Sequence, residues 1–239
     1  MKSKEIRIKS PTMFTPGMSE HYENEKPEEL SEFSGAKLSV SSALRVMKEN
    51  YSLLRRAEEV RVTNLKDPTN TKIGAMVKTY TFVKDKVRGP LYERTAAAEQ
   101  GLRDQISEIN TRVSRPITKE AESGRFGSEA RSHVKSLPVT DRVSFVRQAI
   151  DKGDYKTAAY VLGAPAYLSG LEEEDIRLLL DSYQRKRYAK EFRVLDYLEK
   201  LADNLGKGFI AASSNLDVVE TPEVAKALKL HKAAEEAMS

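Results

Sequence analysis

The chain has 239 residues with 39% hydrophobic and 32% charged content, and it contains neither Cys nor Trp. The absence of Cys excludes disulfide bonds, thiolate metal sites and cysteine nucleophiles, and is typical of a protein from a reducing compartment. Lys and Arg outnumber Asp and Glu by only 40 to 36, so the net charge is weak evidence for a nucleic-acid partner.

Aromatic residues make up 7% of the chain, which favours helices with much solvated surface over a deep pocket lined by aromatic rings. No apolar run approaches the length of a transmembrane helix, and the polar start of the chain lacks the apolar run of a signal peptide. We therefore expect a soluble protein that is not exported by a standard signal and has no membrane partner.

Residues 1–36 are predicted to form an irregular N-terminal arm. Prolines and glycines interrupt this segment, and its apolar residues are sparse and aperiodic. Ile6 and Ile8 alternate with basic residues, which allows a short edge strand, a tail that becomes ordered on a partner, or a solvated terminus. The basic residues at its start could contact phosphate or an acidic neighbour.

Residues 37–113 are predicted to form a helical hairpin. Apolar residues keep helical spacing from Ser41 to Val62, and the Ser side chains at the start can cap that helix. Asp67–Asn70 contains a turn signal around a proline. A second helical pattern then runs from Lys72 to Arg88, and the short turn predicts that the two helices lie antiparallel.

Gly89 and Pro90 interrupt the second helical pattern, so we expect a kink or a new helix at this point. Beyond it, apolar and small residues recur in a nearly heptad order between Thr95 and Val113. This spacing resembles a coiled-coil seam, but it covers fewer than three heptads. The alternative is that the seam packs inside the helical bundle of the same chain.

Residues 114–133 are predicted to be a linker, because Gly, Pro, Ser and Thr dominate over apolar anchors. Residues 134–239 are predicted to form a C-terminal helical domain. Its first helix ends at Gly153, and Asp154 caps a shorter helix that closes at Gly163. Thr221 and Pro222 form a good start for the final helix.

The longest continuous helical pattern runs from Glu172 to Leu205 and is predicted to be the spine of this domain. Acidic residues open it, where they favour the positive end of the helix dipole, and Gly206 can end it. Apolar residues form one broad stripe along it: Ile176, Leu180, Tyr183, Tyr188, Phe192, Leu195, Leu198, Ala202 and Leu205. The predicted fold is therefore all-α: an elongated helical hairpin or bundle with a long C-terminal spine helix and an irregular N-terminal arm.

Motifs that carry chemistry are absent from the sequence. His21, His133 and His231 have no metal-binding partners at a recognised spacing. There is no glycine-rich phosphate loop and no Gly-x-Ser-x-Gly motif. The acidic run Glu172–Asp175 is interpreted as a helix start, because consecutive helical residues point in different directions. We predict no catalytic residue, no metal site and no cofactor.

One basic patch has functional content and lies in the middle of the predicted spine helix. Lys186, Lys190 and Arg193 share a face, and Arg187 lies beside them, so phosphate or an acidic partner could neutralise several charges together. The alternative is a solvated helix face in which Arg187 pairs with Glu191 four residues later. No helix-turn-helix, zinc or RNA-binding motif surrounds the patch.

Residues 131–171 contain, in this order, the sequences RSHVKSL, DR, AI, GD and VLGAPAYLSGL. This segment resembles poorly characterised proteins encoded by tailed bacteriophages and prophages. The resemblance covers about a sixth of the chain and contains no catalytic signature. It implies association with phage particles or with their assembly.

We therefore predict a non-enzymatic structural or assembly component of a tailed bacteriophage particle, located in the virion or the host cytoplasm and acting through helix-mediated contacts. Its expected partners are other virion or assembly proteins, and we expect a homo-oligomer. The alternative is a basic nucleic-acid-binding protein associated with the phage genome. An enzyme ranks third, because no pair of groups for acid–base or nucleophilic chemistry can be nominated.

Overall fold

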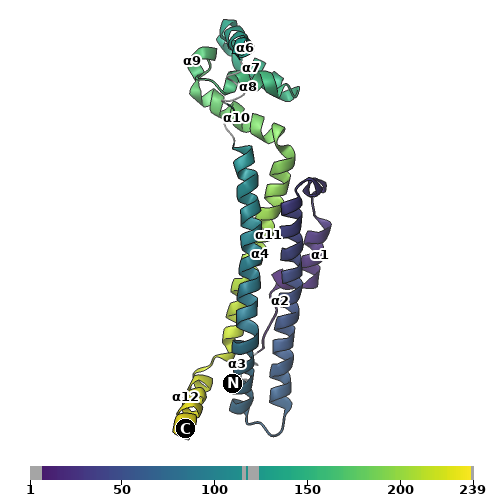
Figure 1. The fold of residues 1–239 in the computed structure, drawn as a ribbon, viewed down its shortest axis with the longest axis vertical. Coiled ribbons are helices and arrows are strands. Elements are labelled where there is room, and N and C mark those ends of the chain that lie inside the picture. The colour runs from purple at the N-terminus through teal and green to yellow at the C-terminus, as the bar shows by residue number, and fades with distance from the viewer. Residues whose placement is uncertain (1–6, 115–116, 118–123, 238–239) are drawn as a thin grey trace. The chain divides into compact units, whose positions relative to one another are not determined.

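The computed structural model describes residues 7–114, 117 and 124–237, and every regular element within these ranges is a helix (Figure 1). The predicted all-α class is therefore confirmed. The chain divides into two compact units. Unit 1 comprises Met1–Ile106 with Tyr197–Ser239, and unit 2 comprises Ser107–Asp196.

Unit 1 is built on the predicted helical hairpin. Helix α2 (Ser34–Lys66) is followed by a turn, α3 (Lys72–Val83), a π-helical segment η3 (Lys84–Arg88) and α4 (Gly89–Val113). In the turn, the Asp67 carboxylate accepts hydrogen bonds from the N–H and the hydroxyl of Thr69, at 2.9 and 2.7 Å. These bonds hold the pKa of Asp67 below its usual value.

Two hydrogen bonds between polar side chains show that the two arms of this hairpin are antiparallel. Asn64 donates to the hydroxyl of Thr79 at 3.2 Å, and Asn50 donates to the hydroxyl of Thr95 at 2.9 Å. From Thr95 to Gln105, the heptad-like seam of α4 thus packs against α2 of the same chain, as the alternative to a coiled coil predicted. Most of the side chains that the sequence placed on the inner stripes are buried: Leu44, Met47, Leu54, Ala57, Val83, Val87, Ala98, Leu102, Ile109 and Val113.

Gly89 and Pro90 do not break the second arm of the hairpin. Pro90 has no N–H to give to the carbonyl four residues earlier, and the wider π-helical turn just before it lets the chain continue as a helix. Helix α3 thus ends at Val83 and a new α-helix, α4, begins at Gly89 as predicted, although the π-helical segment between them keeps the chain helical from residue 72 to residue 113.

The N-terminal segment differs from the predicted irregular arm. Residues 1–6 lie outside the described ranges, but residues 12–32 contain the short helix η1 (Thr12–Phe14), α1 (Pro16–Asn24) and η2 (Glu28–Glu32). The prolines that interrupt the sequence pattern instead stand at helix starts, where a missing N–H costs nothing. Side chains of this segment are buried in unit 1: Ile8, Phe14, Tyr22 and Leu30.

The predicted spine helix is two helices in the structure. Helix α10 (Glu173–Arg187) ends at Tyr188, whose backbone angles of φ −109° and ψ 32° leave the helical region, and α11 (Ala189–Leu216) begins directly after it. The prediction that Gly206 ends the helix is also wrong, because α11 continues to Leu216. The final helix α12 (Pro222–Ala237) begins where predicted, and the Thr221 hydroxyl accepts the N–H of Val224 at 3.3 Å.

Gly208 explains why α11 does not end at the glycines. A Cβ atom at this position would lie 2.6 Å from Cε1 of Phe14 and 3.0 Å from Cβ of Met13. Phe14 is fully buried, so its ring occupies the space that a side chain at position 208 would need. The glycine therefore serves close packing of the N-terminal segment on α11, and it is not a helix stop.

Unit 2 contains α6 (Gly124–Ser136), α7 (Val139–Asp151), α8 (Tyr155–Leu162), α9 (Ala166–Ser169) and α10. Residues 124–133 of the predicted linker are thus helical, while residues 115–116 and 118–123 lie outside the described ranges. Asp154 caps α8 as predicted, accepting the Thr157 N–H at 3.1 Å. The core of unit 2 is formed by Val134, Val146, Ile150, Ala158, Val161, Leu162, Leu171, Leu179 and Tyr183, among others.

The two compact units differ from the predicted domains 37–113 and 134–239. Residues 197–239 of the predicted C-terminal domain belong to the same unit as the N-terminal hairpin. The physical reason is contact between residues that are distant in the sequence. Tyr197 donates its hydroxyl hydrogen to the carbonyl of Tyr22 at 2.7 Å, and Asn215 donates to the carbonyl of Lys9 at 3.0 Å. Local periodicity cannot reveal such distant partners.

Glu58 fixes the start of the N-terminal segment to α2. Its carboxylate accepts the backbone N–H of Ile8 at 2.8 Å and two N–H groups of Arg61, both at 2.7 Å. Burial acts to raise the pKa of Glu58, but these hydrogen bonds and the nearby positive charges outweigh it and lower the pKa. A lowered pKa means that the folded state favours the charged carboxylate.

We expect the N-terminal segment to loosen in acid. Because the pKa of Glu58 is lowered on folding, its stabilisation is present above the ordinary carboxyl pKa of 4.5 and is lost as the pH falls through the lower folded value. Glu58→Gln should mimic this loss at neutral pH and speed amide hydrogen exchange in residues 8–33. Glu59→Gln is the matched control, because Glu59 lies one residue later on α2 and pairs with exposed Arg55. Equal exchange rates in the two variants would contradict the assignment.

Candidate functional site

The structure places the predicted basic patch on two helices. Lys186 and Arg187 end α10, whereas Lys190 and Arg193 lie at the start of α11, beyond the break at Tyr188. The prediction that Lys186, Lys190 and Arg193 share one face of a continuous helix is therefore wrong.

Each of these cations already has an interaction partner. Lys186 forms an ion pair with Asp151, and Arg187 donates to the hydroxyl of Tyr183 and lies 5.4 Å from the centre of its ring. Lys190 and Arg193 also have interaction partners. Glu191, the expected partner of Arg187, instead lies 3.9 Å from Arg112. Lys186, Lys190 and Arg193 are nevertheless exposed, so three of the four cations remain at the surface of the protein.

The histidines and acidic residues do not gather into a metal site. Among the described residues, no group of three or more His, Cys, Asp or Glu side chains is placed to hold a metal ion. The ring of His133 packs edge-on against Phe145 at 5.1 Å between centroids, and Glu173–Asp175 form the first turn of α10. His133 thus packs against an aromatic ring, and the acidic residues lie at a helix start, where the helix dipole favours negative charge.

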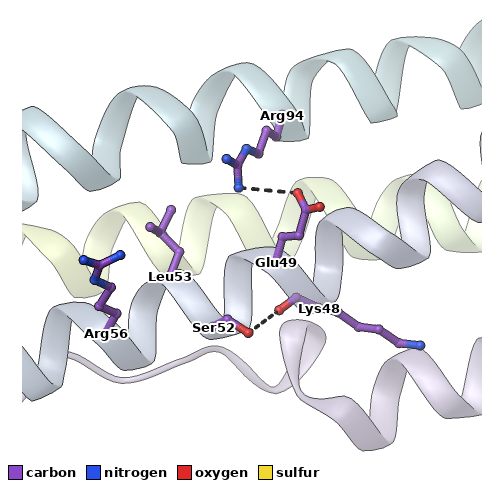
Figure 2. Close-up of a pocket in the computed structure, with 6 residues that line it drawn as sticks. All are labelled: Lys48, Glu49, Ser52, Leu53, Arg56 and Arg94. Carbon is purple, nitrogen blue, oxygen red and sulfur yellow. Dashed lines mark hydrogen bonds and ion pairs between the residues drawn. The ribbon is translucent and has the colours of Figure 1, made fainter.

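A cationic groove lies on unit 1 between α2 and α4 (Figure 2). Its volume is about 440 Å³. The residues that line it are Lys48, Glu49, Ser52, Leu53, Arg56 and Arg94. Three cations and one carboxylate therefore share an open surface site, which carries a local surplus of positive charge.

Glu49 positions the guanidinium group that α4 contributes to this groove. Its carboxylate lies 3.4 Å from Nη1 of Arg94 and 3.9 Å from Nε of Arg45. Figure 2 shows Leu53 and Arg56 on α2 along the same opening, whereas the ammonium group of Lys48 extends away from Arg94. Arg56 also lies over the ring of Phe82, 5.9 Å from its centre. The two arginines are thus the cations that the fold holds at the groove.

Sequence reasoning missed this site. Lys48, Ser52 and Arg56 recur at four-residue steps and mark one face of α2, which is a signal that could have been noted. Arg94 is distant in the sequence, and only the hairpin register brings it to that face.

Unit 2 carries a second depression, with a volume of about 590 Å³, at the junction of α9 and α10. Its walls are mainly apolar, and two carboxylates lie at its edge. The residues that line it are Ala164, Pro165, Ala166, Tyr167, Gly170, Leu171, Glu172, Glu173 and Ile176. Tyr167 is 71% exposed, so its ring is available to a partner. We call this site the Tyr167 depression.

Arg142 fixes the wall of the Tyr167 depression. Its guanidinium group donates to the carbonyl of Gly170 at 2.7 Å, of Leu137 at 3.1 Å and of Lys135 at 3.0 Å. Lys135 in turn donates to the carbonyl of Tyr167 at 3.2 Å. The depression is therefore formed by a chain segment held in place by charge-assisted hydrogen bonds.

In the part of the chain that the structure describes, no helix is both long enough and apolar enough to span a lipid bilayer. The protein-family models that were searched include none that matches this chain, and no curated protein or solved structure matches it.

Proposed function

We propose that this protein is a non-enzymatic structural or assembly component of a tailed bacteriophage particle, which acts through helix-mediated protein–protein contacts. The observation that carries the proposal is the Tyr167 depression. Its wall at residues 164–171 belongs to the segment that resembles phage-encoded proteins. One surface feature and one sequence resemblance thus coincide in the same residues.

The chemistry of the depression supports protein contact. An exposed aromatic ring beside an apolar hollow is typical of interface hot spots, where tyrosine supplies a large contact area with little loss of conformational freedom. The hydrogen bonds of Arg142 hold the hollow in shape before a partner binds, which lowers the cost of ordering on association. Glu172 and Glu173 at the edge favour a partner with basic side chains.

The proposed partners are other virion or assembly proteins and further copies of this chain, in the virion or in the host cytoplasm. A repeated contact of this kind needs a rigid surface on a stable helical unit. The buried core of unit 2, which includes Val161, Leu171 and Leu179, lies next to the depression and supplies that support.

Tyr167→Ser is expected to weaken association about thirtyfold, the effect of losing a hot-spot side chain of about 2 kcal/mol. Sedimentation velocity at micromolar concentration tests self-association of the 26.8 kDa chain. The thermal midpoint should barely change, because the ring is exposed. Phe126→Ser is the matched control, since Phe126 is 70% exposed in the same unit and does not line the depression. A strict monomer that also binds no virion protein would contradict the proposal.

A further inference from the structure

We propose that the cationic groove of unit 1 binds a phosphate group through the guanidinium groups of Arg56 and Arg94. The inference does not depend on the proposed assembly role, because it concerns different residues in a different unit. The ligand chemistry is a phosphate oxyanion, supplied either by a nucleic-acid strand or by free phosphate.

The distribution of charge favours an anion at this position. Elsewhere on the same helices, exposed arginines are matched by carboxylates: Arg55 lies 3.5 Å from Glu59, and Arg103 donates to Glu99 at 2.6 Å. In the groove, Glu49 is the single carboxylate beside the two arginines, and the ammonium group of Lys48 extends away from Arg94 (Figure 2). Arg56 lies over the aromatic ring of Phe82 and forms no ion pair with a described residue. An oxyanion would complete the charge pairing that the groove lacks.

The two arginines line the groove from two helices, Arg56 from α2 and Arg94 from α4. Glu49, which pairs with Arg94, stands about two helical turns before Arg56 on α2. Leu53 lies between Glu49 and Arg56 in Figure 2 and also lines the groove. Guanidinium groups bind phosphate with two parallel hydrogen bonds. Ser52, whose hydroxyl now donates to the carbonyl of Lys48 at 3.0 Å, offers a further polar group at the site.

An acidic protein helix fits the groove less well. A helix that binds in a groove needs apolar anchors at several successive turns, and Leu53 is the one large apolar residue that lines this groove. Phosphate needs no such anchors, because its affinity comes from charge and hydrogen bonding. The composition of the lining therefore favours the smaller and more highly charged ligand.

A change at Glu49 should alter phosphate affinity in the opposite direction from changes at the two arginines. Its carboxylate repels an incoming phosphate and holds Arg94, so Glu49→Gln should strengthen binding roughly twofold to fivefold. Replacing both arginines by glutamine should weaken binding by about tenfold or more. For duplex DNA, the slope of log affinity against log salt should also fall by about 1, the value for one neutralised phosphate. The readout is fluorescence anisotropy of a labelled oligonucleotide, single-stranded or duplex, titrated with the full chain.

Matched variants separate the groove from the general charge of the protein. Arg55→Gln with Arg103→Gln removes the same charge from the same two helices outside the groove, and Glu59→Gln matches Glu49→Gln. These controls should change affinity much less than the groove variants. Circular dichroism checks that each variant keeps its helical content. Equal effects of groove and control variants would show a diffuse electrostatic attraction and would overturn the proposal.

Two further experiments identify the source of the phosphate. If the oligonucleotide does not bind, phosphorus NMR of inorganic phosphate should show line broadening that the double arginine variant abolishes, which supports free phosphate as the ligand. If a polyglutamate peptide of matched length competes as well as the oligonucleotide, the groove recognises an acidic protein and the proposal fails. Binding of neither the oligonucleotide nor inorganic phosphate would also overturn it.

Discussion

Phe14→Ala is expected to lower the free energy of unfolding of unit 1 by about 3–5 kcal/mol, the range for removing a fully buried aromatic ring. The ring of Phe14 has no exposed surface, and it fills the space above Gly208 on α11. Its loss leaves a cavity between the N-terminal segment and that helix. Urea unfolding followed by circular dichroism measures the change, and hydrogen exchange in residues 8–33 locates it.

Gly208→Ala tests the same contact from the other side. Its Cβ atom would approach the Phe14 ring to 2.6 Å, so the ring must move, at a cost of about 1–3 kcal/mol. In the double variant the alanine at position 208 enters the space that the ring vacates. The double variant should therefore be less destabilised than the sum of the two single variants. Additive effects would contradict the packing of Phe14 on Gly208.

Gly170→Ala is expected to destabilise unit 2 in two ways, through the backbone and through Arg142. Gly170 has φ +70°, a conformation that disfavours residues with a Cβ atom by about 1–2 kcal/mol. The added atom would also lie 2.7 Å from Nη1 of Arg142, which displaces the guanidinium group from its hydrogen bond to the Gly170 carbonyl. The total cost should reach about 2–4 kcal/mol.

Gly153 supplies the matched control for this prediction. It has φ +77°, but nothing lies within 4 Å of the position where its Cβ atom would stand. Gly153→Ala should therefore show the conformational cost alone, about 1–2 kcal/mol. The difference between the two variants isolates Arg142, and it should vanish when Arg142→Ala is the common background. A difference that persists in that background would refute the role assigned to Arg142.

Local rules predicted the parts of this fold that depend on neighbouring residues. The turn at Asp67, the cap at Asp154 and the helix start at Thr221 each satisfy backbone groups within a few residues. Helical periodicity likewise identified the buried stripe of α2. These features need no knowledge of the tertiary structure.

Other features depend on residues that are distant in the sequence. Glycine often follows the end of a helix, but Gly208 lies within α11 because Phe14 packs against it. The prolines of the N-terminal segment start helices because α2 and α11 provide a surface for Phe14 and Tyr22. No glycine or proline marks the helix break at Tyr188.

The candidate sites also combine features that neighbouring residues determine with features that depend on distant residues. The basic run at residues 185–187 was visible in the sequence, but its partner Asp151 was not. The groove was missed because Arg94 reaches Glu49 only through the register of the hairpin. The Tyr167 depression lies in the segment that the resemblance had marked, although its shape depends on Arg142 from another helix.

Mass spectrometry of purified particles tests the proposed assembly role most directly. If the proposal holds, the gene lies in a tailed phage or prophage, and its particles would be compared with lysate fractions that hold assembly intermediates. The proposal predicts the chain at a fixed ratio to particle proteins, with cross-links from lysines near the Tyr167 depression, such as Lys135, to another protein or a second copy. Absence of the chain from both particles and intermediates would contradict it.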